Sequence, residues 1–258
     1  MSDLLKFQML SGTVGELVLN QPAKRNALTA GMWDALPHKL KAAEETENLR
    51  LLIIRGEGEH FSAGADISEF STLYATPENA AKASSSIAAA MKALAATACP
   101  TIAMIRGACA GGGCALALAC DIRFADDTAK FAVTPARLGL VYPYEDIQRL
   151  IGIVGLANAK DMILSSRVIK AQEAIGFGLI NFCHKPEALE TAVMEYAESL
   201  SVLSPSSLKV MKNMAQSYQD GQRGDNEKTR EQFQSAFTSR DFTEGFSAFM
   251  AKRKPDFK

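Results

Sequence analysis

The chain contains one pattern twice: an apolar run ends in Ile-Arg-Gly and continues through small residues into a helical segment. The runs span residues 51–55 and 101–106, and their length and composition predict two buried strands. Strands that alternate with helical segments predict an α/β fold. The two copies also indicate a ββα structural repeat, and chance similarity between two short runs is the alternative.

Other segments of the first half fit the same alternation. We expect a strand at residues 15–19, helices at 30–45 and 78–96, a helix opening near Gly112, and a strand at 120–124. From about residue 170 the pattern changes, because apolar residues then recur mainly at helical spacing. The helices expected there span residues 171–176, 187–200, 205–218, 223–237 and 241–252.

This change of pattern predicts two regions, a core at residues 1–195 and a helical region at residues 196–258. A chain of 258 residues with 47% hydrophobic residues is large enough to bury a sizeable core. No Gly/Ser-rich linker separates the two regions. We therefore expect the helical region to pack on the core or on a neighbouring subunit.

The charge balance argues against a nucleic-acid or membrane partner. Lys and Arg number 28 against 29 Asp and Glu, which gives a net charge of -1 and no general attraction to anionic polymers or lipids. The longest apolar run, residues 108–120, is too short and too rich in glycine to span a bilayer. The N-terminus also lacks the pattern of a signal peptide.

The cysteines and histidines predict neither disulfides nor a metal site. The five cysteines are odd in number and lack paired metal-like spacing, which favours buried free thiols in a reducing compartment. The three histidines are isolated in the sequence. A cytoplasmic protein is therefore expected.

Two segments rich in small residues, 61–67 and 107–115, are the candidates for chemistry, and each lies between a strand and a helix. Amides at helix starts have no intrahelical partner and carry a partial positive charge, so those of Ala65 and Gly112 can donate to a developing oxyanion. A tight turn is the alternative for the first segment. The second segment meets neither the Rossmann nor the P-loop fingerprint.

Five ordered stretches resemble the crotonase superfamily, the enoyl-CoA hydratase/isomerase family, over nearly the whole chain. The resemblance implies a ββα spiral core with a helical C-terminal trimerisation region, and a homotrimer or a dimer of trimers. It also implies an acyl-CoA substrate whose thioester oxygen is held as an enolate by the amides of Ala65 and Gly112. Coenzyme A is then part of the substrate, and no cofactor is tightly bound. The five stretches are residues 20–28, 61–67, 111–113, 121–125 and 249–257.

The resemblance further implies which residues hold coenzyme A. Two lie near its phosphates, three belong to a loop around its adenine, and two reach over from a neighbouring subunit. Basic residues at a helix C-terminus also complement the helix dipole, so the last of these residues has an alternative role that needs no ligand. The two near the phosphates are Lys24 and Arg25, and the three in the adenine loop are Ala63, Asp66 and Ile67. The two from the neighbouring subunit are Phe249 and Lys252.

The chain departs from the family where hydratases of this type carry two catalytic glutamates. The matching positions hold Ala115 and Pro135, and neither side chain can transfer a proton. Addition of water by the usual two-carboxylate route is therefore not expected.

Residues 131–139 and the tyrosine at position 142 resemble the methylmalonyl-CoA decarboxylase branch of the family. Loss of CO₂ generates the enolate directly, so two amides and the orienting hydroxyl of Tyr142 can suffice without a strong base. We therefore favour decarboxylase-like or other lyase chemistry, although that branch has a histidine where this chain has Ala65. For Tyr142 the alternative is a buried aromatic whose hydroxyl meets a backbone group.

Two further hypotheses stay open. A Δ3,Δ2-enoyl-CoA isomerase needs one carboxylate to carry a proton between two carbons, and Glu145 or Asp146 is available for this role. Both acids also fit the start of a helix, where the dipole favours negative charge. The absent glutamates also fit a CoA-binding or assembly module without catalysis.

Overall fold

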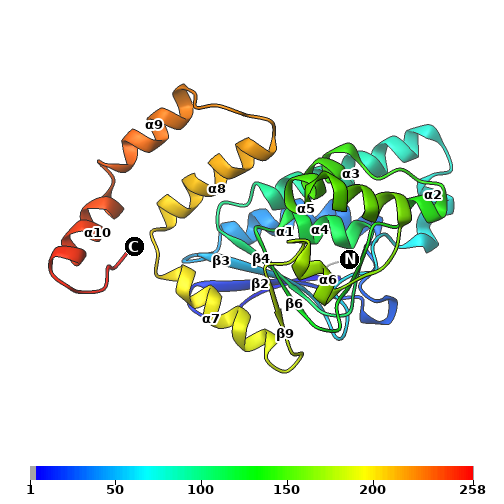
Figure 1. The fold of residues 1–258 in the computed structure, drawn as a ribbon, viewed down its shortest axis with the longest axis horizontal. Helices are drawn as coiled ribbons and strands as arrows, with labels where there is room; N and C mark the ends of the chain where they lie inside the picture. Colours follow the sequence, from blue (N-terminus) through cyan, green and yellow to red (C-terminus); the bar gives the residue numbers. More distant parts are fainter. Residues whose placement is uncertain (1–3, 258) are drawn as a thin grey trace.

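The centre of the protein is a six-stranded sheet, seen in the computed structural model that describes residues 4–257 (Figure 1). Its strands are β1 (Leu5–Met9), β2 (Val14–Leu19), β3 (Leu51–Gly56), β4 (Thr101–Ile105), β6 (Ile122–Asp126) and β9 (Phe182–His184), in the order β1-β2-β3-β4-β6-β9. The first two strands are antiparallel, and all other neighbours are parallel.

Helices cover both faces of the sheet, and this confirms the predicted α/β fold. The long helices are α1 (Ala30–Glu44), α3 (Pro77–Ala95), α4 (Gly112–Ala119), α5 (Tyr144–Ser165), α7 (Leu189–Ser201), α8 (Pro205–Gln219), α9 (Glu227–Ala236) and α10 (Arg240–Met250). Short helical segments are α2 (Phe70–Leu73), α6 (Ala171–Gly176) and 3-10 turns at Pro22–Lys24, Ile67–Glu69 and Pro135–Leu138. None of the helices within residues 4–257 has the length and apolar character needed to cross a membrane.

Successive residues of the central strands contribute to two separate hydrophobic clusters. Ile54 of β3 belongs to the large cluster shared with α1, α3 and α4, whereas Ile53 belongs to the cluster shared with α7. Side chains alternate between the two faces of a strand, so one apolar run supplies both layers. Figure 1 shows the resulting order, with α1, α3, α4 and α5 over one face and α7 across the other.

The repeated sequence pattern lies at the centre of the sheet. β3 and β4 are parallel neighbours, with Ile54 opposite Ala103. Beyond the two strands, Ser62 forms an isolated bridge with Cys109. Cys109 belongs to a second sheet of three strands, β5 (Ala108–Ala110), β7 (Lys130–Ala132) and β8 (Ile169–Lys170). The two copies of the pattern therefore lie side by side in space.

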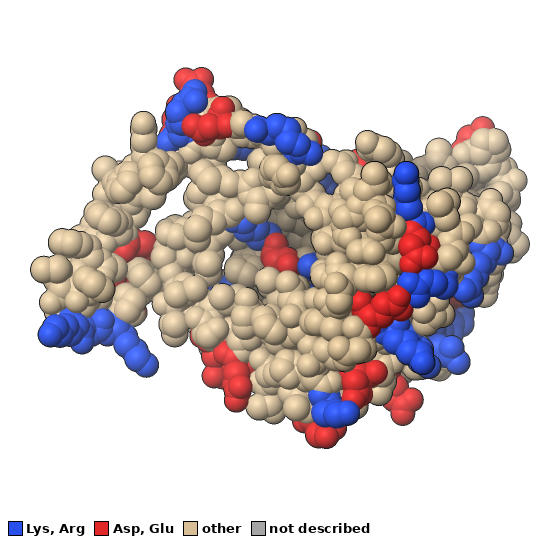
Figure 2. All heavy atoms as spheres, in the orientation of Figure 1, with Lys and Arg blue, Asp and Glu red and all other residues tan. Residues whose placement is uncertain are grey.

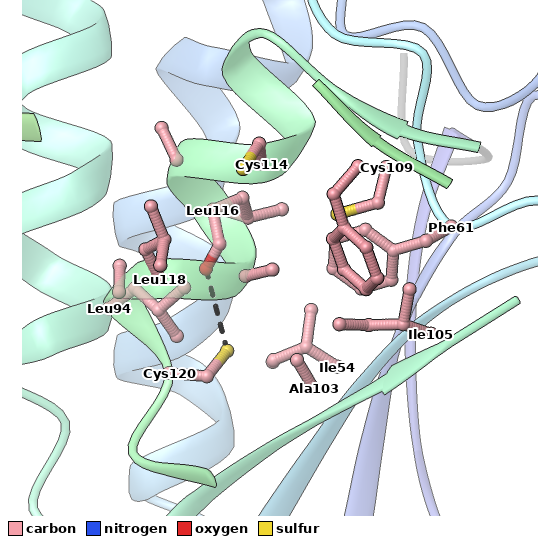
Figure 3. Packing of buried hydrophobic residues seen from close by; sticks show 14 of the residues in the cluster. Ile54, Phe61, Leu94, Ala103, Ile105, Cys109, Cys114, Leu116, Leu118 and Cys120 are labelled. Atoms are coloured by element: carbon pink, nitrogen blue, oxygen red, sulfur yellow. Dashed lines mark hydrogen bonds between the residues drawn. The ribbon is translucent and has the colours of Figure 1, made fainter. Parts of the chain in front are cut away.

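A dense apolar cluster fills the space between α4 and the sheet (Figure 3). Phe61, Cys109 and Cys114 lie within it. All five cysteines are free, and Cys109, Cys114 and Cys120 are buried, whereas the other two are partly exposed. Burial raises the pKa of Cys120 to about 12, so this thiol stays protonated and unreactive. The prediction of free thiols is thus confirmed, and that of burial is confirmed for three.

The strand expected at residues 120–124 begins later, at Ile122. The preceding Asp121 instead joins three elements, because its carboxylate accepts from the amide of Thr101 at 2.7 Å and from the ammonium of Lys212 in α8 at 2.7 Å. Asp121 is therefore a structural residue, as its position before a β-rich run predicts.

Helices α8, α9 and α10 form an arm that extends away from the core (Figure 1). Figure 2 shows a hollow between the arm and the core, and a cavity of about 440 Å³ lies there against α8. The division expected at residue 195 falls inside α7, which packs on the sheet through Val193 and Ala197. The change from sheet-packed helix to arm therefore follows Ser201, where α7 ends.

Candidate active site

Backbone hydrogen bonds draw the two small-residue segments together. The amide of Ser62 donates to the carbonyl of Ala108 at 2.9 Å, and the amide of Ala110 donates to the carbonyl of Ser62 at 3.0 Å. On the other side, the amide of Leu28 donates to the carbonyl of Gly64 at 2.7 Å. The alignment of the two segments therefore depends on main-chain atoms.

The amides of Ala65 and Gly112 lie close together at this junction. A Cβ added to Gly112 would lie 3.7 Å from the nitrogen of Ala65. A Cβ is two bonds from its own nitrogen, so the two amide nitrogens are within about 6 Å of each other. Two nitrogens at about 2.9 Å from one shared oxygen are at most about 5.8 Å apart, and the limit of about 6 Å is compatible with such a shared acceptor. Neither amide donates a hydrogen bond to another group within residues 4–257, so both are available to a ligand.

Glycine is required in both segments for steric reasons. Gly64 has a φ of +97°, and an added Cβ would lie 2.7 Å from the carbonyl oxygen of Ala110. In the second segment, a Cβ added to Gly113 would lie 2.6 Å from the carbonyl oxygen of Ser62. The small residues thus permit close backbone packing, and the same packing leaves the two amides exposed to a cavity.

This cavity, of about 520 Å³, opens beside the two amides. Its volume is within the range of about 300–1,000 Å³ that is typical of small-molecule sites. The walls come from the two small-residue segments, from one face of α3 and from residues 134–146. Much of the wall is apolar and includes Ile67, Ile87, Met91, Leu138, Leu140 and Val141.

Two carboxylates at the start of α5 line the same cavity. Asp146 is buried, and its Oδ1 accepts from Nη1 of Arg149 at 2.9 Å. Burial raises the pKa of Asp146 above its ordinary 3.8, although Arg149 acts in the opposite direction. Oδ2 has no hydrogen-bond partner within the described residues. Glu145 is exposed beside it.

The hydroxyl of Tyr142 meets a backbone group. Tyr142 is buried in the cavity wall, and its hydroxyl donates to the carbonyl of Gly111 at 3.3 Å. Burial raises the pKa of Tyr142 well above 10, so the hydroxyl cannot act as a base at neutral pH. Because Gly111 and Gly112 share a peptide bond, this contact orients one of the two free amides.

The structure therefore brings the four residues expected to be catalytic, Ala65, Gly112, Tyr142 and Glu145, to one cavity. The family model described as "Enoyl-CoA hydratase/isomerase" matches residues 10–258. The chain belongs to the enoyl-CoA hydratase/isomerase family.

Individual relatives agree with this assignment. The chain is 36% identical over 248 residues to a probable enoyl-CoA hydratase of Bacillus subtilis, covering 93% of this chain and 92% of that protein. It is 31% identical over 262 residues to a peroxisomal Delta(3,5)-Delta(2,4)-dienoyl-CoA isomerase of Arabidopsis thaliana, covering 95% and 92%. A crystal structure of an enoyl-CoA hydratase/isomerase family protein from Hyphomonas neptunium has a TM-score of 0.95 at 38% identity, covering 99% and 97%.

Family membership confirms the crotonase-like fold and identifies the protein as an acyl-CoA enzyme of the crotonase superfamily. The two positions expected to lack catalytic glutamates differ in their surroundings. Ala115 is buried inside α4 and does not line the cavity, whereas Pro135 forms part of the wall. At neither position does the chain offer a proton-transfer group.

Of the residues expected to hold coenzyme A, Ala63, Asp66 and Ile67 lie on the loop beside the amides. Lys24 donates to Oδ2 of Asp66 at 2.7 Å, and hydrogen bonds from Lys24 and Ser68 hold the pKa of Asp66 below its ordinary 3.8. Lys24 and Asp66 thus fasten this loop to the 3-10 turn at residues 22–24.

The other residues expected to hold coenzyme A are Arg25 and, in the arm, Phe249 and Lys252. Arg25 is exposed, and its carbonyl accepts from the amide of Ala63 at 2.9 Å. Phe249 and Lys252 lie at the end of α10, which Figure 1 shows at the opposite side of the molecule from α2 and α3. Within one chain these two residues are therefore remote from the cavity.

Trp33 is one of the residues of the site that the sequence did not predict. It lies on α1 and is 3% exposed, and its Nε1 has no hydrogen-bond partner among the described residues. Its ring packs on Gly112, and it lines the cavity. Its helical spacing is that of an ordinary core residue, so only its being the single tryptophan of the chain sets it apart.

Proposed function

We propose that the protein is an isomerase that moves a double bond along an unsaturated acyl-CoA. The amides of Ala65 and Gly112 hold the thioester oxygen while negative charge develops on it. One carboxylate takes a proton from one carbon of the acyl group and returns it to another. The observation that supports this proposal is that two unbonded amides and the carboxylate of Asp146 line one cavity.

Asp146 is the better candidate for the proton carrier. Arg149 fixes Oδ1 and leaves Oδ2 without a partner in the described chain. Burial raises the pKa of Asp146, which makes its carboxylate a stronger base than an exposed aspartate. Glu145 is exposed and has no partner that orients it within residues 4–257.

The geometry gives less support to hydration and to decarboxylation than to isomerisation. Hydration requires a second acid or base on the opposite side of the double bond, and Ala115 and Pro135 provide none. Decarboxylation of a methylmalonyl group requires a substrate carboxylate in the cavity, next to Glu145 and Asp146 and without a lining cation among the described residues. Tyr142 supports either reaction only by orienting the Gly111 carbonyl.

Incubation with a 3-enoyl-CoA in D₂O tests the proposal. Formation of the conjugated 2-enoyl thioester, followed by its ultraviolet absorbance, reports isomerisation, and mass spectrometry reports the deuterium it incorporates. Crotonyl-CoA and methylmalonyl-CoA, assayed in parallel, report hydration and decarboxylation. Fast hydration or decarboxylation without isomerisation would refute the proposal, and no turnover of any of the three would favour a non-catalytic CoA-binding module.

The variants Asp146→Asn and Glu145→Gln form a matched pair, because each removes one negative charge and keeps the shape of the side chain. We expect Asp146→Asn to lower kcat by about 10²-fold or more, the usual contribution of a general base, and Glu145→Gln to lower it by less than about tenfold. The reverse order would assign the proton transfer to Glu145.

We also propose that coenzyme A is held between subunits of a homotrimer or a dimer of trimers. Lys24, Arg25 and the loop at residues 63–67 lie on one chain beside the cavity, whereas Phe249 and Lys252 are remote within it. The arm also exposes aromatic side chains, and burial against another subunit would stabilise it. Light scattering after size exclusion should show at least three chains, and a monomer at working concentration would refute this arrangement.

A further inference from the structure

The described residues that line the cavity include acidic side chains and no basic ones. Among its described lining residues the charged ones are Glu145 and Asp146, and no Lys, Arg or His belongs to the wall. Arg149 is held by Asp146 at 2.9 Å and lies outside the wall. Among the described residues the wall of this cavity therefore offers no counter-ion to an anionic group, and Lys82 of α3 lines a separate cavity that shares Trp33 and Ala65 with it.

The remaining wall is mostly apolar, and its hydroxyl and indole groups carry no charge; these include the groups of Trp33, Tyr74, Ser84, Thr134 and Tyr144. The inner side of α3 contributes Ile87 and Met91, and the segment before α5 contributes Leu138, Leu140 and Val141. A carboxylate placed among these side chains loses hydration without gaining a hydrogen-bond donor of comparable strength. The two acids add like-charge repulsion.

We propose that the site takes acyl-CoA thioesters with an uncharged, apolar acyl group and discriminates against acyl groups that end in a carboxylate. This proposal rests on the proposed function, because that function puts the acyl group in this cavity. Hexanoyl-CoA and adipoyl-CoA have the same number of acyl carbons and differ at the far end, where adipoyl-CoA has a carboxylate. The wild-type protein should bind hexanoyl-CoA at least about tenfold more tightly, since the missing counter-ion penalises only the anion.

One position on α3 allows a gain-of-binding test. Ser84 lines the cavity and is exposed, whereas its neighbour Ser85 is also exposed and does not line it. Ser84→Lys brings a cation to the wall and should reduce the preference for hexanoyl-CoA to less than about threefold. Ser85→Lys adds the same charge to the same helix outside the cavity and should leave the wild-type ratio unchanged.

The experiment is equilibrium calorimetry with the two thioesters on the wild-type protein and both variants. Both acyl groups are saturated, so binding is measured without isomerisation. Equal affinities for the wild type, or equal changes in the two lysine variants, would overturn the selectivity. A retained preference for hexanoyl-CoA in a protein that does not isomerise 3-enoyl-CoA would overturn the proposed reaction alone.

Discussion

The substitution Gly112→Ala tests the arrangement of the two amides most directly. The new methyl group would lie 3.1 Å from Cζ2 of Trp33 and 3.7 Å from the nitrogen of Ala65. The contact with Trp33 requires the indole to move by a few tenths of an ångström. The contact with Ala65 puts the methyl group beside an amide that the thioester oxygen needs as a donor. Loss of one oxyanion donor costs about 2.7–4 kcal/mol, or about 10²–10³ in kcat.

The effect on stability should be small by comparison. Alanine is favoured over glycine in a helix by up to about 1 kcal/mol, and this offsets part of the contact with Trp33. We expect the free energy of unfolding to change by less than about 1 kcal/mol, which corresponds to about 2–4 °C in Tm for a chain of this size. The measurements are kcat with a 3-enoyl-CoA and Tm by calorimetry.

Gly176→Ala is the matched control, because Gly176 lies in α6 and an added Cβ would meet nothing within 4 Å. It should leave kcat unchanged. Wild-type kcat in Gly112→Ala would show that the reacting oxygen does not need the amide of Ala65, beside which the methyl group lies. A fall in Tm of more than about 10 °C would show instead that the contact with Trp33 cannot relax.

Three further outcomes follow from the site. Tyr142→Phe removes the 3.3 Å hydrogen bond to the Gly111 carbonyl. It should lower the free energy of unfolding, measured in urea, by about 1 kcal/mol and kcat by less than about tenfold. A loss of kcat of about 10²-fold or more would show that the hydroxyl takes part in the chemistry. Lys24→Met breaks the ion pair with Asp66 and should lower Tm only slightly. The pKa of Asp66 is lowered in the folded protein, so the carboxylate contributes to stability only while it is charged. The difference in Tm between variant and wild type should therefore be present above pH 3.8 and disappear as the pH falls below it. Because burial raises the pKa of Asp146, kcat/KM should fall on the acid side with an apparent pKa above 3.8, and an acid limb at or below 3.8 would contradict the role of this carboxylate.

The sequence predicts the central strands well because their apolar runs are continuous. β3 and β4 differ from the expected ranges by one residue each, since buried strands show a clear local pattern. The N-terminal strand β1 was not predicted, although Leu5–Met9 alternates apolar and polar residues over its five positions. Its pairing of Leu5 with Leu19 depends on a partner strand rather than on local pattern alone.

The backbone part of the site was predictable from local sequence, and Tyr142, Glu145 and Asp146 were also expected there, but the contacts that their side chains make were not. The small residues around Ala65 and Gly112 indicate amides in two loops, because glycine and alanine permit close approach. Side-chain positions follow from tertiary packing. Nothing local shows that Trp33 of α1 contacts Gly112, or that Arg149 holds one oxygen of Asp146.

The hydrogen bonds of Ser62 with β5 and of Leu28 with Gly64 set the separation of the two donors through peptide groups. Substitutions that change every proton-handling side chain of the pocket can therefore leave thioester polarisation intact. A protein with this junction can lose one reaction during evolution and still bind the thioester substrate. It can then acquire another reaction by a few replacements at positions that line the cavity, such as Pro135 and Asp146. The reaction is therefore easier to change than the substrate class.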